Sequence, residues 1–345
     1  MVLTKTQSLT VCDVCVHISN EFPDARLKGR GRMTNHIDRQ TTLADQVTLT
    51  GIGVHSGKPA SITLLPADAG TGIVFQRTDK DDAAEIPALW NRVTQTSLQT
   101  VLGDPSENGM STVEHLMAAL AGMGIDNLII EVDGPEMPIM DGSSAAFVDA
   151  IDQVGVKHLD RGRRYLKVKK PVRVDNGSAW CELKPYDGTR FEITIDFDTP
   201  LIGRQTFASD LTPQVFREEL CRARTFGYVK DVEQLWKMGF ALGSSLENSV
   251  AIAEDKVLNP EGTRWQDEFA RHKALDAVGD LSLAGLPILG LYRSYKGGHK
   301  MNNAILAKLF EDKSAYEIVE APAFREVGHA ENAGLAAAAF GPDVS

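Results

Sequence analysis

Cysteine, long apolar runs and positive charge are all scarce in this 345-residue chain. Its four cysteines are too few to build a disulfide framework in a chain of this length. No stretch of about 18 consecutive apolar residues occurs, so we expect no transmembrane helix. The formal net charge of −11 argues against a nucleic-acid partner, although a few local cations can still bind a small anionic molecule.

The first 36 residues are polar and weakly patterned, and we expect them to form a disordered N-terminal extension, with Met33 as a second candidate start. They lack an apolar core and an A-x-A-like site, so we predict no signal peptide and a cytoplasmic protein. Cys12 and Cys15 have the spacing of half a zinc site. No second pair follows them, and we interpret the spacing as incidental.

The following segments alternate between strand-like and helix-like patterns. β-Branched residues bounded by Gly and Pro predict strands within residues 41–67, 71–79 and 127–134. Apolar residues at helical spacing, with a Gly stop, predict helices at residues 111–124 and 142–155.

A similar order recurs in the second half of the chain. Strand patterns occupy much of residues 165–198, a long helix is expected at 264–283, a strand at 286–296 and a helix at 302–310. This recurrence predicts an α+β fold of two similar domains, each a layered β-sheet with packed helices, with a cleft between them.

The boundaries follow from the same patterns. We place the first domain at residues 37–160 and the second at 161–325, joined by "DRGRRY" at 160–165 as a linker. A small-residue-rich tail at 326–345 is expected to fray.

The helix expected at 264–283 carries ionisable residues among apolar ones, in the segment "EFARHKALDAVGDL". Burying such groups is costly unless they are paired or bound to a metal. At about 100° per residue, His272, Asp276, Asp280 and Lys273 fall within one arc of about 100°. His272 and Asp276 lie four residues apart and can point at one metal ion, with an ordinary ion pair as the alternative.

The predicted helix in "STVEHLMAAL" offers a third ligand, because it places His115 beside Glu114 in its first turn. Two histidines and one aspartate, with a position left open for water, would form a catalytic zinc site. Glu114 also follows Ser111 by three residues, as in a capping box, and that alternative needs no catalysis.

A third histidine, His299, follows two glycines at the start of the predicted helix in "YKGGHKMNNAIL". A histidine on a glycine-rich turn can come close to a bound molecule, because glycine leaves the backbone accessible. A surface-loop histidine is the simpler alternative.

In combination these segments resemble the UDP-3-O-acyl-N-acetylglucosamine deacetylase family, the zinc amidases of lipid A biosynthesis in Gram-negative bacteria. The resemblance spans residues 40–320 and keeps the order of the family's motifs. It implies the same fold of two layered α+β domains, with the active site in the cleft between them. The matching segments are "TGIGVHSGK", "STVEHLMAALAGMGIDNLIIEVDGPEMPIMDGSSAAF", "ARTFGYV", "DEFARHKALDAVGDL" and "GGHKMNNAIL".

The resemblance implies a role for each matching polar residue. His115, His272 and Asp276 would bind zinc, with Fe²⁺ as an alternative ion. Glu114 would be the general base, and His299 the electrostatic stabiliser and general acid.

Two further residues would support this chemistry by the same resemblance. Asp280 would orient His299 and favour its charged form, and Thr225 would contact the oxyanion. The implied reaction is hydrolysis of the 2-acetamido group of UDP-3-O-(hydroxyacyl)-N-acetylglucosamine, releasing acetate. The implied partner is that UDP-acyl-sugar, with no nucleic acid, at most peripheral membrane contact and a monomeric protein.

The resemblance also implies substrate contacts. Lys273 would contact phosphate, Phe226 would form a wall near the substrate, Phe197 would stack on uracil and His55 would support the site. Residues 226–245 read as an insert that offers an apolar passage for the acyl chain, with an amphipathic core helix as the alternative. Its apolar candidates are Val229, Leu235, Trp236, Met238 and Phe240.

One segment departs from the family pattern. Where family members often continue "GGSFDCAI", this chain reads "LGSSLENSV", so that Glu247 replaces an aspartate. That change puts any family contact at Glu247 in doubt.

Two other functional classes fit the same donor set. A 2-His-1-carboxylate iron oxygenase uses ligands of the same composition, but it does not need a glutamate such as Glu114 beside His115. A non-catalytic module with a structural zinc would need a fourth ligand, and Cys221 is the nearest cysteine by sequence.

Overall fold

The computed structural model describes residues 39–81 and 84–321. The expectations for residues 1–36, including the cysteine pair, and for the tail at 326–345 lie outside the described residues. Among the described helices, none is both long enough and apolar enough to cross a membrane.

The first half of the described chain builds a five-stranded sheet with the strand order β2-β3-β8-β4-β5. Its strands are β2 (Val47–Ile52), β3 (Pro59–Pro66), β4 (Ile73–Arg77), β5 (Ile86–Pro87) and β8 (Leu128–Val132). Burial alternates along β3, as expected of a strand with one face on a core. Ile62 and Leu64 of β3 are fully buried in that core.

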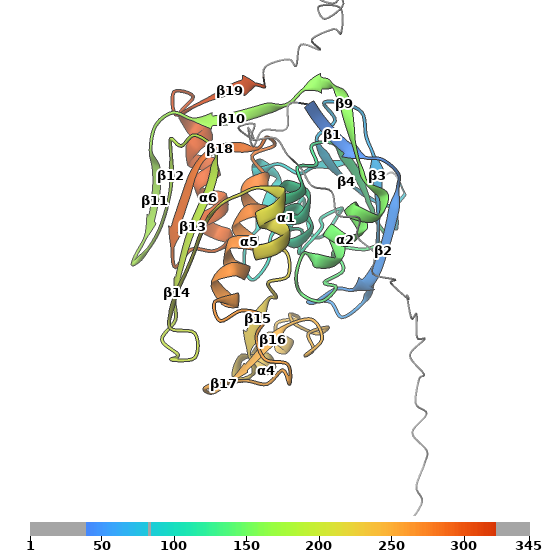
Figure 1. The fold of residues 1–345 in the computed structure, drawn as a ribbon. Helices are drawn as coiled ribbons and strands as arrows, with labels where there is room; N and C mark the ends of the chain where they lie inside the picture. Colours follow the sequence, from blue (N-terminus) through green and yellow to red (C-terminus); the bar gives the residue numbers. More distant parts are fainter. Residues whose placement is uncertain (1–38, 82–83, 322–345) are drawn as a thin grey trace, which may run out of the picture. The chain divides into compact units, whose positions relative to one another are not determined.

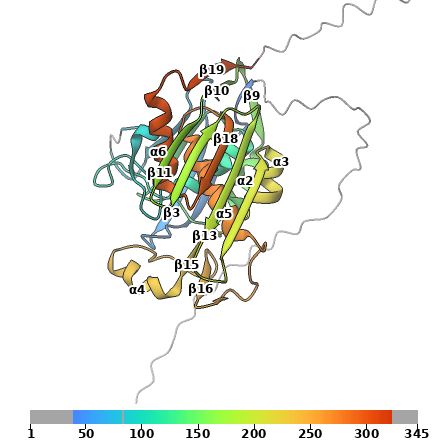
Figure 2. The ribbon, with the colours of Figure 1, turned by 90° about the vertical axis from the view of Figure 1, so that its left-hand side faces the viewer.

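The second half builds a seven-stranded sheet around the strand β18. Its strands are β10 (Arg164–Val168), β11 (Val172–Asn176), β12 (Ala179–Lys184), β13 (Thr189–Asp196), β14 (Arg204–Asp210), β18 (Ile288–Tyr295) and β19 (Tyr316–Glu320). β18 pairs antiparallel with β12 and parallel with β13 and β10. Figure 2 looks onto this sheet, with α5 behind it.

Four helices lie between the two sheets in the view of Figure 1. They are α1 (Glu114–Met123), α2 (Ala145–Val154), α5 (Glu268–Ser282) and α6 (His299–Glu311). α1 packs against α5 and α2, while α5 and α6 pack against strands of the seven-stranded sheet. The structure therefore confirms the predicted α+β class and the helices predicted within residues 111–124, 142–155, 264–283 and 302–310.

Short elements complete the described chain. They are β1 (Arg39–Leu43), η1 (Trp90–Arg92), β6 (Val93–Gln95), β7 (Val101–Leu102), β9 (Val156–Gly162), α3 (Pro213–Val215) and the π-helical turn η2 (Phe216–Leu220). A small three-stranded sheet, β15 (Phe226–Tyr228), β16 (Val250–Ala253) and β17 (Lys256–Val257), carries α4 (Val229–Lys237). The predicted insert near 226–245 contains β15 and α4, whereas β16 and β17 follow it in the chain.

The predicted linker at 160–165 is wrong as a description of local structure, because these residues lie largely within strands β9 and β10. β9 pairs antiparallel with β1, more than a hundred residues earlier in the chain. Arg163, between the two strands, donates from Nε to Asp126 Oδ1 at 2.9 Å. Pairing with a distant strand thus makes this segment a strand, although its polar composition predicted a linker. The division into domains at residues 160 and 161 stays a prediction.

The helices α1 and α5 approach each other closely at Gly279 of α5. A Cβ atom at this position would lie 2.1 Å from the carbonyl oxygen of Glu114 and 3.1 Å from the amide nitrogen of Ala118. Only a residue without a side chain permits the two backbones to approach so closely. This contact sets the spacing between the two helices that carry the candidate metal ligands.

We predict that Gly279→Ala lowers the free energy of unfolding by about 3 kcal/mol or more, at or beyond the usual upper range for overpacking, because the added methyl meets backbone rather than a flexible side chain. Chemical denaturation followed by circular dichroism measures the change. The matched control is Gly134→Ala, because a Cβ atom there has nothing within 4 Å. Equal stability of the two variants would contradict the tight contact at Gly279.

Candidate active site

Two helices bring three potential metal ligands together: His115 from α1, and His272 and Asp276 from α5. All three side chains are buried, and one ligand atom of each lies within 4.8 Å of the others. Asp276 Oδ1 is 3.4 Å from His272 Nε2 and 3.6 Å from His115 Nε2. The two imidazole rings lie 5.0 Å apart at an interplanar angle of 82°. The structure thus assembles the three residues that the sequence singled out as ligands.

The donor set fits a metal ion. Asp276 Oδ1 is buried and has no hydrogen-bond partner among the described residues. The two nitrogens that face it are farther away than in an ordinary N–H···O hydrogen bond, but all three donor atoms turn toward a common point. Cys221, considered as a fourth ligand, lies outside this group, and its Sγ donates to the Arg217 carbonyl at 3.1 Å. Three protein ligands with an open position are typical of catalytic rather than structural zinc.

His272 is held in the tautomer that suits metal binding. Its Nδ1 lies 3.0 Å from the carbonyl oxygen of Ala223, and because a carbonyl can only accept, Nδ1 carries the proton. Nε2 is therefore left with a lone pair toward the site. Burial lowers the pKa of His272 to about 3 in spite of the opposing charge of Asp276, so the ring is neutral at pH 7.

The Ala223 carbonyl is positioned by its buried neighbour Arg224. The backbone amide and Nε of Arg224 both donate to Glu268 Oε1, at 3.1 and 3.0 Å, and Glu268 is the first residue of α5. Arg224 is 2% exposed and Glu268 is fully buried, so each charge compensates the other. The sequence patterns did not reveal this pair, although both residues lie within the quoted segments "ARTFGYV" and "DEFARHKALDAVGDL".

Lys273 contacts a candidate metal ligand in this structure. Its Nζ donates to Asp276 Oδ2 at 2.9 Å, and it also lies 5.6 Å from the ring centroid of Phe226. Burial would raise the pKa of Asp276, but His272 and Lys273 outweigh burial and hold it well below its usual value. The Lys273 side chain as a whole is 26% exposed.

Glu114 is the first residue of α1, and its carboxylate faces the site rather than capping the helix. Its Oε2 accepts a hydrogen bond from the backbone amide of Thr100 at 3.0 Å, and its Oε1 lies 3.8 Å from His299 Nε2. Burial raises the pKa of Glu114, against the opposing effect of His299. Ser111 Oγ donates instead to Pro135 O at 3.1 Å, so the capping-box alternative is wrong.

Asp280 and His299 form a buried pair, as the sequence led us to expect. Asp280 Oδ2 lies 2.8 Å from His299 Nδ1 and accepts from Asn302 Nδ2 at 2.8 Å, while Oδ1 accepts from the Thr100 hydroxyl at 2.6 Å. Burial would lower the pKa of His299, but Asp280 and Glu114 raise it to about 9. His299 is therefore protonated at pH 7, and its Nε2 lies 3.8 Å from Glu114 Oε1 and 3.9 Å from Asp276 Oδ2. Thr100 and Asn302 carried no signal that the sequence patterns could detect.

Thr225 and Phe226 lie directly after the Ala223–Arg224 segment. The backbone amide of Thr225 donates to Gly142 O, and its carbonyl accepts from the Val250 amide, both at 2.8 Å. The Phe226 ring packs edge-on against His272 at 6.2 Å between centroids. Phe226 is thus beside a candidate ligand, where a wall of the site was expected.

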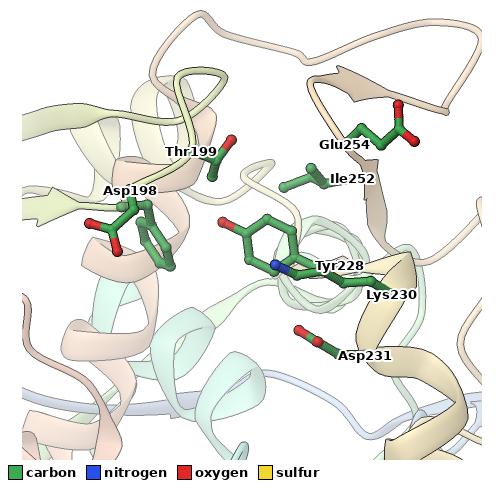
Figure 3. Close-up of a pocket in the computed structure, with 8 residues that line it drawn as sticks. Asp198, Thr199, Tyr228, Lys230, Asp231, Ile252 and Glu254 are labelled. Atoms are coloured by element: carbon green, nitrogen blue, oxygen red, sulfur yellow. The ribbon is translucent and has the colours of Figure 1, made fainter.

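Phe197 lies farther out, with its ring 5.9 Å from that of Phe226. It lines a cavity of about 310 Å³ that Figure 3 shows in close-up. The labelled lining side chains come from the turn after β13 and from β15, α4 and β16 with its following residue. They are Asp198, Thr199, Tyr228, Lys230, Asp231, Ile252 and Glu254.

His55 connects the candidate site to the insert. Its Nδ1 accepts a hydrogen bond from the Ala241 amide at 3.3 Å, and its ring packs edge-on against Phe240 at 5.2 Å. Burial lowers the pKa of His55, against the opposing effect of the Glu136 carboxylate. The backbone amide of His55 donates to the buried carboxylate of Glu136 at 2.7 Å, a contact that the sequence patterns missed.

The insert helix α4 has no buried residue, so the core-helix alternative for residues 226–245 is wrong. Its neighbourhood exposes large apolar side chains, with Trp236 52% and Met238 57% exposed. Phe240 and Leu235 are half-buried. Glu247 is exposed, and its amide donates to Ser245 Oγ at 3.2 Å.

Comparisons with known proteins point to one enzyme family. Residues 40–311 match the family model described as LpxC, UDP-3-O-acyl N-acetylglycosamine deacetylase. The chain is also similar to proteins named UDP-3-O-acyl-N-acetylglucosamine deacetylase from Brucella ovis, Brucella canis and Brucella melitensis biotype 2. Each is 54% identical over 283 residues, which cover 82% of this chain and 99% of the relative.

The opposite pKa shifts of His272 and His299 predict that the combined contribution of these two residues to the stability of the metal-free protein is largest near pH 6.5. As pH falls below 6.5, the unfolded state protonates His272 while the folded state does not until about pH 3, so stability decreases. As pH rises above 6.5, the unfolded state releases the His299 proton while the folded state keeps it to about pH 9, so stability again decreases. Urea denaturation in chelator between pH 4 and 10 measures both limbs.

A variant and a control separate these limbs. His299→Gln should flatten the alkaline limb, whereas His158→Gln, at an exposed position, should leave the profile unchanged. An alkaline limb that persists in His299→Gln would show that another group causes it.

Proposed function

The chain belongs to the UDP-3-O-acyl N-acetylglycosamine deacetylase family, and from that premise we propose how its buried site carries out the reaction. The protein is a hydrolase that deacetylates UDP-3-O-acyl-N-acetylglucosamine in lipid A biosynthesis. The observation that carries the proposal is the opposition of a carboxylate and a protonated imidazole, Glu114 and His299, beside a three-residue metal-ligand group.

We propose that His115, His272 and Asp276 hold the metal ion on which this family depends, and that the ion is Zn²⁺. Two neutral imidazoles and a carboxylate are a common donor set for catalytic zinc, although Fe²⁺ accepts the same ligands. When bound, such an ion supplies Lewis-acid polarisation of the acetamide carbonyl and an acidified water. Lys273 and the Arg224–Glu268 pair keep these ligands in place.

Glu114 acts as the general base in this proposal. Its Oε2 is occupied by the Thr100 amide, which leaves Oε1 to take the proton of the attacking water. Burial raises the pKa of Glu114, and the higher basicity brings the carboxylate closer to what a base working at neutral pH requires.

His299 acts from the opposite side as a cation. Its Nδ1 is bound to Asp280, so Nε2 is the nitrogen that donates into the site. A fixed positive charge there stabilises the oxyanion and can pass a proton to the leaving amine. Thr225 is proposed as a second group at the oxyanion, supported by its place two residues after Ala223, whose carbonyl holds His272.

The rest of the substrate is assigned from the surrounding surfaces. We place uracil against Phe197, because the adjoining cavity offers an aromatic face and carboxylates that can accept from ribose hydroxyls and from the uracil N–H. The same carboxylates would repel a diphosphate, so Lys273 remains the proposed phosphate contact. A phosphate bound there would share Lys273 with Asp276.

The acyl chain is assigned to the insert of residues 226–245. Support comes from the exposed apolar side chains around α4 and from the docking of Ala241 on His55, which links this surface to the site. Cytoplasmic location, a monomeric state and at most peripheral membrane contact stay predictions from the sequence.

We expect the zinc-replete protein to release acetate from the UDP-acyl-sugar and the chelator-stripped protein to be inactive until zinc is restored. His272→Ala should lose bound zinc by elemental analysis. Glu114→Gln should retain zinc and lose about 10²- to 10⁴-fold in kcat, because it removes the base without removing a ligand.

Lys300→Gln provides a control, since Lys300 follows His299 but its side chain is exposed. It should keep both zinc and turnover. Full turnover by Glu114→Gln would remove Glu114 from the reaction, and full zinc content in His272→Ala would remove His272 from the ligand set.

The assignment of uracil to Phe197 predicts that Phe197→Ala raises KM by about 10-fold with little change in kcat, because stacking of one base on an aromatic ring contributes about 1–3 kcal/mol. Phe197→Tyr, which keeps an aromatic face, should behave as the wild type. Steady-state acetate release gives both constants. A fall in kcat at constant KM would place Phe197 near the reacting atoms instead.

A further inference from the structure

We propose that Thr100 is a positioning residue that holds the base Glu114 and the acid pair Asp280–His299 in one fixed geometry. The inference rests on the proposed roles of those residues and assigns Thr100 a role of its own. Thr100 lies just before β7, on neither of the helices that carry the groups it contacts.

All three polar groups of Thr100 are engaged at the site. Its backbone amide donates to Glu114 Oε2 at 3.0 Å, and its hydroxyl donates to Asp280 Oδ1 at 2.6 Å. Its carbonyl accepts from the amide of Val113, the residue before Glu114, at 3.4 Å. One residue, 2% exposed, thus connects the start of α1 with the C-terminal end of α5.

Each of the two contacts made by Thr100 occupies one oxygen of a carboxylate and leaves the other oxygen for a different partner. Because Thr100 occupies Oε2 of Glu114, Oε1 is the oxygen left to face His299 Nε2 at 3.8 Å. Asp280 receives His299 and Asn302 on Oδ2, so the Thr100 hydroxyl on Oδ1 fixes the rotation of the carboxylate plane. Rotation of that plane would move His299 relative to Glu114.

The stiffness of the side chain suits this role. Threonine is branched at Cβ and has few χ1 choices, so its hydroxyl stays where the backbone places it. The same backbone position is fixed by the bond to Glu114. Thr100 therefore ties the spacing of the base and the acid to a single local conformation.

A purely structural reading makes a different prediction. In that reading the hydroxyl only satisfies a buried carboxylate, and its loss lowers stability without a specific effect on turnover. The two interpretations can be distinguished by a substitution that removes the hydroxyl and keeps the shape of the side chain. The effect of that substitution on kcat is then compared with its effects on KM, zinc content and melting temperature.

The experiment compares Thr100→Val, which is close in shape and lacks the hydroxyl, with Thr100→Ser, which keeps it. Thr42→Val is the matched control, because Thr42 is also 2% exposed and its hydroxyl oxygen accepts from the Ala67 amide away from the site. Zinc-loaded proteins are assayed for kcat and KM by acetate release, for zinc content and for melting temperature. The His299 Nδ1–H resonance is followed by ¹⁵N-edited NMR.

We expect Thr100→Val to lose about 10- to 100-fold in kcat, with KM and zinc content unchanged. This range is typical for the loss of a group that orients a metal ligand or a catalytic side chain. Thr100→Ser should restore most of kcat, and the Nδ1–H resonance should shift or broaden only in Thr100→Val. Thr42→Val should lose stability without losing kcat.

Unchanged kcat in Thr100→Val, or an unchanged Nδ1–H resonance, overturns the proposal. So does a loss in Thr100→Ser as large as that in Thr100→Val. Absence of acetate release by the wild type would instead count against the proposed function, and the NMR comparison would still decide the role of Thr100.

Discussion

The contact of α1 with α5 at Gly279 is the constraint on which the rest of the site depends. The ligands His115 and His272 come from different helices, and they converge because the two backbones approach where no Cβ atom intervenes. A wider helix spacing would separate the donor atoms by more than one ion can bridge. The packing of α1 against α5 therefore also determines whether the candidate ligands can meet at one ion.

In this buried region, the hydrogen-bond and ionic partners of a histidine, and not burial alone, determine whether it is protonated. His272 and His299 are both buried, yet one is neutral and the other protonated at pH 7. His272 faces a carbonyl through Nδ1 and a second imidazole across the site, whereas His299 is bound to the carboxylate of Asp280. The same residue type thus supplies a metal ligand in one place and a cation in the other.

The sequence patterns predicted those features of the site that depend on residues close together in the chain. Helical periodicity brought His272, Asp276 and Asp280 to one stripe, and adjacency in "VEHL" tied Glu114 to His115. The roles of His299 and Thr225 came from family resemblance, since spacing alone left His299 as an ordinary loop histidine. The fold class followed from the alternation of elements.

The remaining features depend on contacts between distant parts of the chain. The hydroxyl of Thr100 meets Asp280 across 180 residues, and Arg224 meets Glu268 across 44. The strand pairing that replaced the expected linker at 160–165 is equally long-range. Ser111 failed as a cap for a local reason: Thr112 adopts a left-handed φ of 59°, which turns the chain before α1 begins. Composition and spacing do not encode such pairings.

The order of the functional residues along the chain has a consequence for biosynthesis. Glu114 and His115 are synthesised early, but His272, Asp276 and His299 follow more than 150 residues later. A polypeptide that ends before His272 carries only one of the three candidate ligands, together with the carboxylate of Glu114. The candidate metal site can therefore be completed only after both halves of the chain have been synthesised.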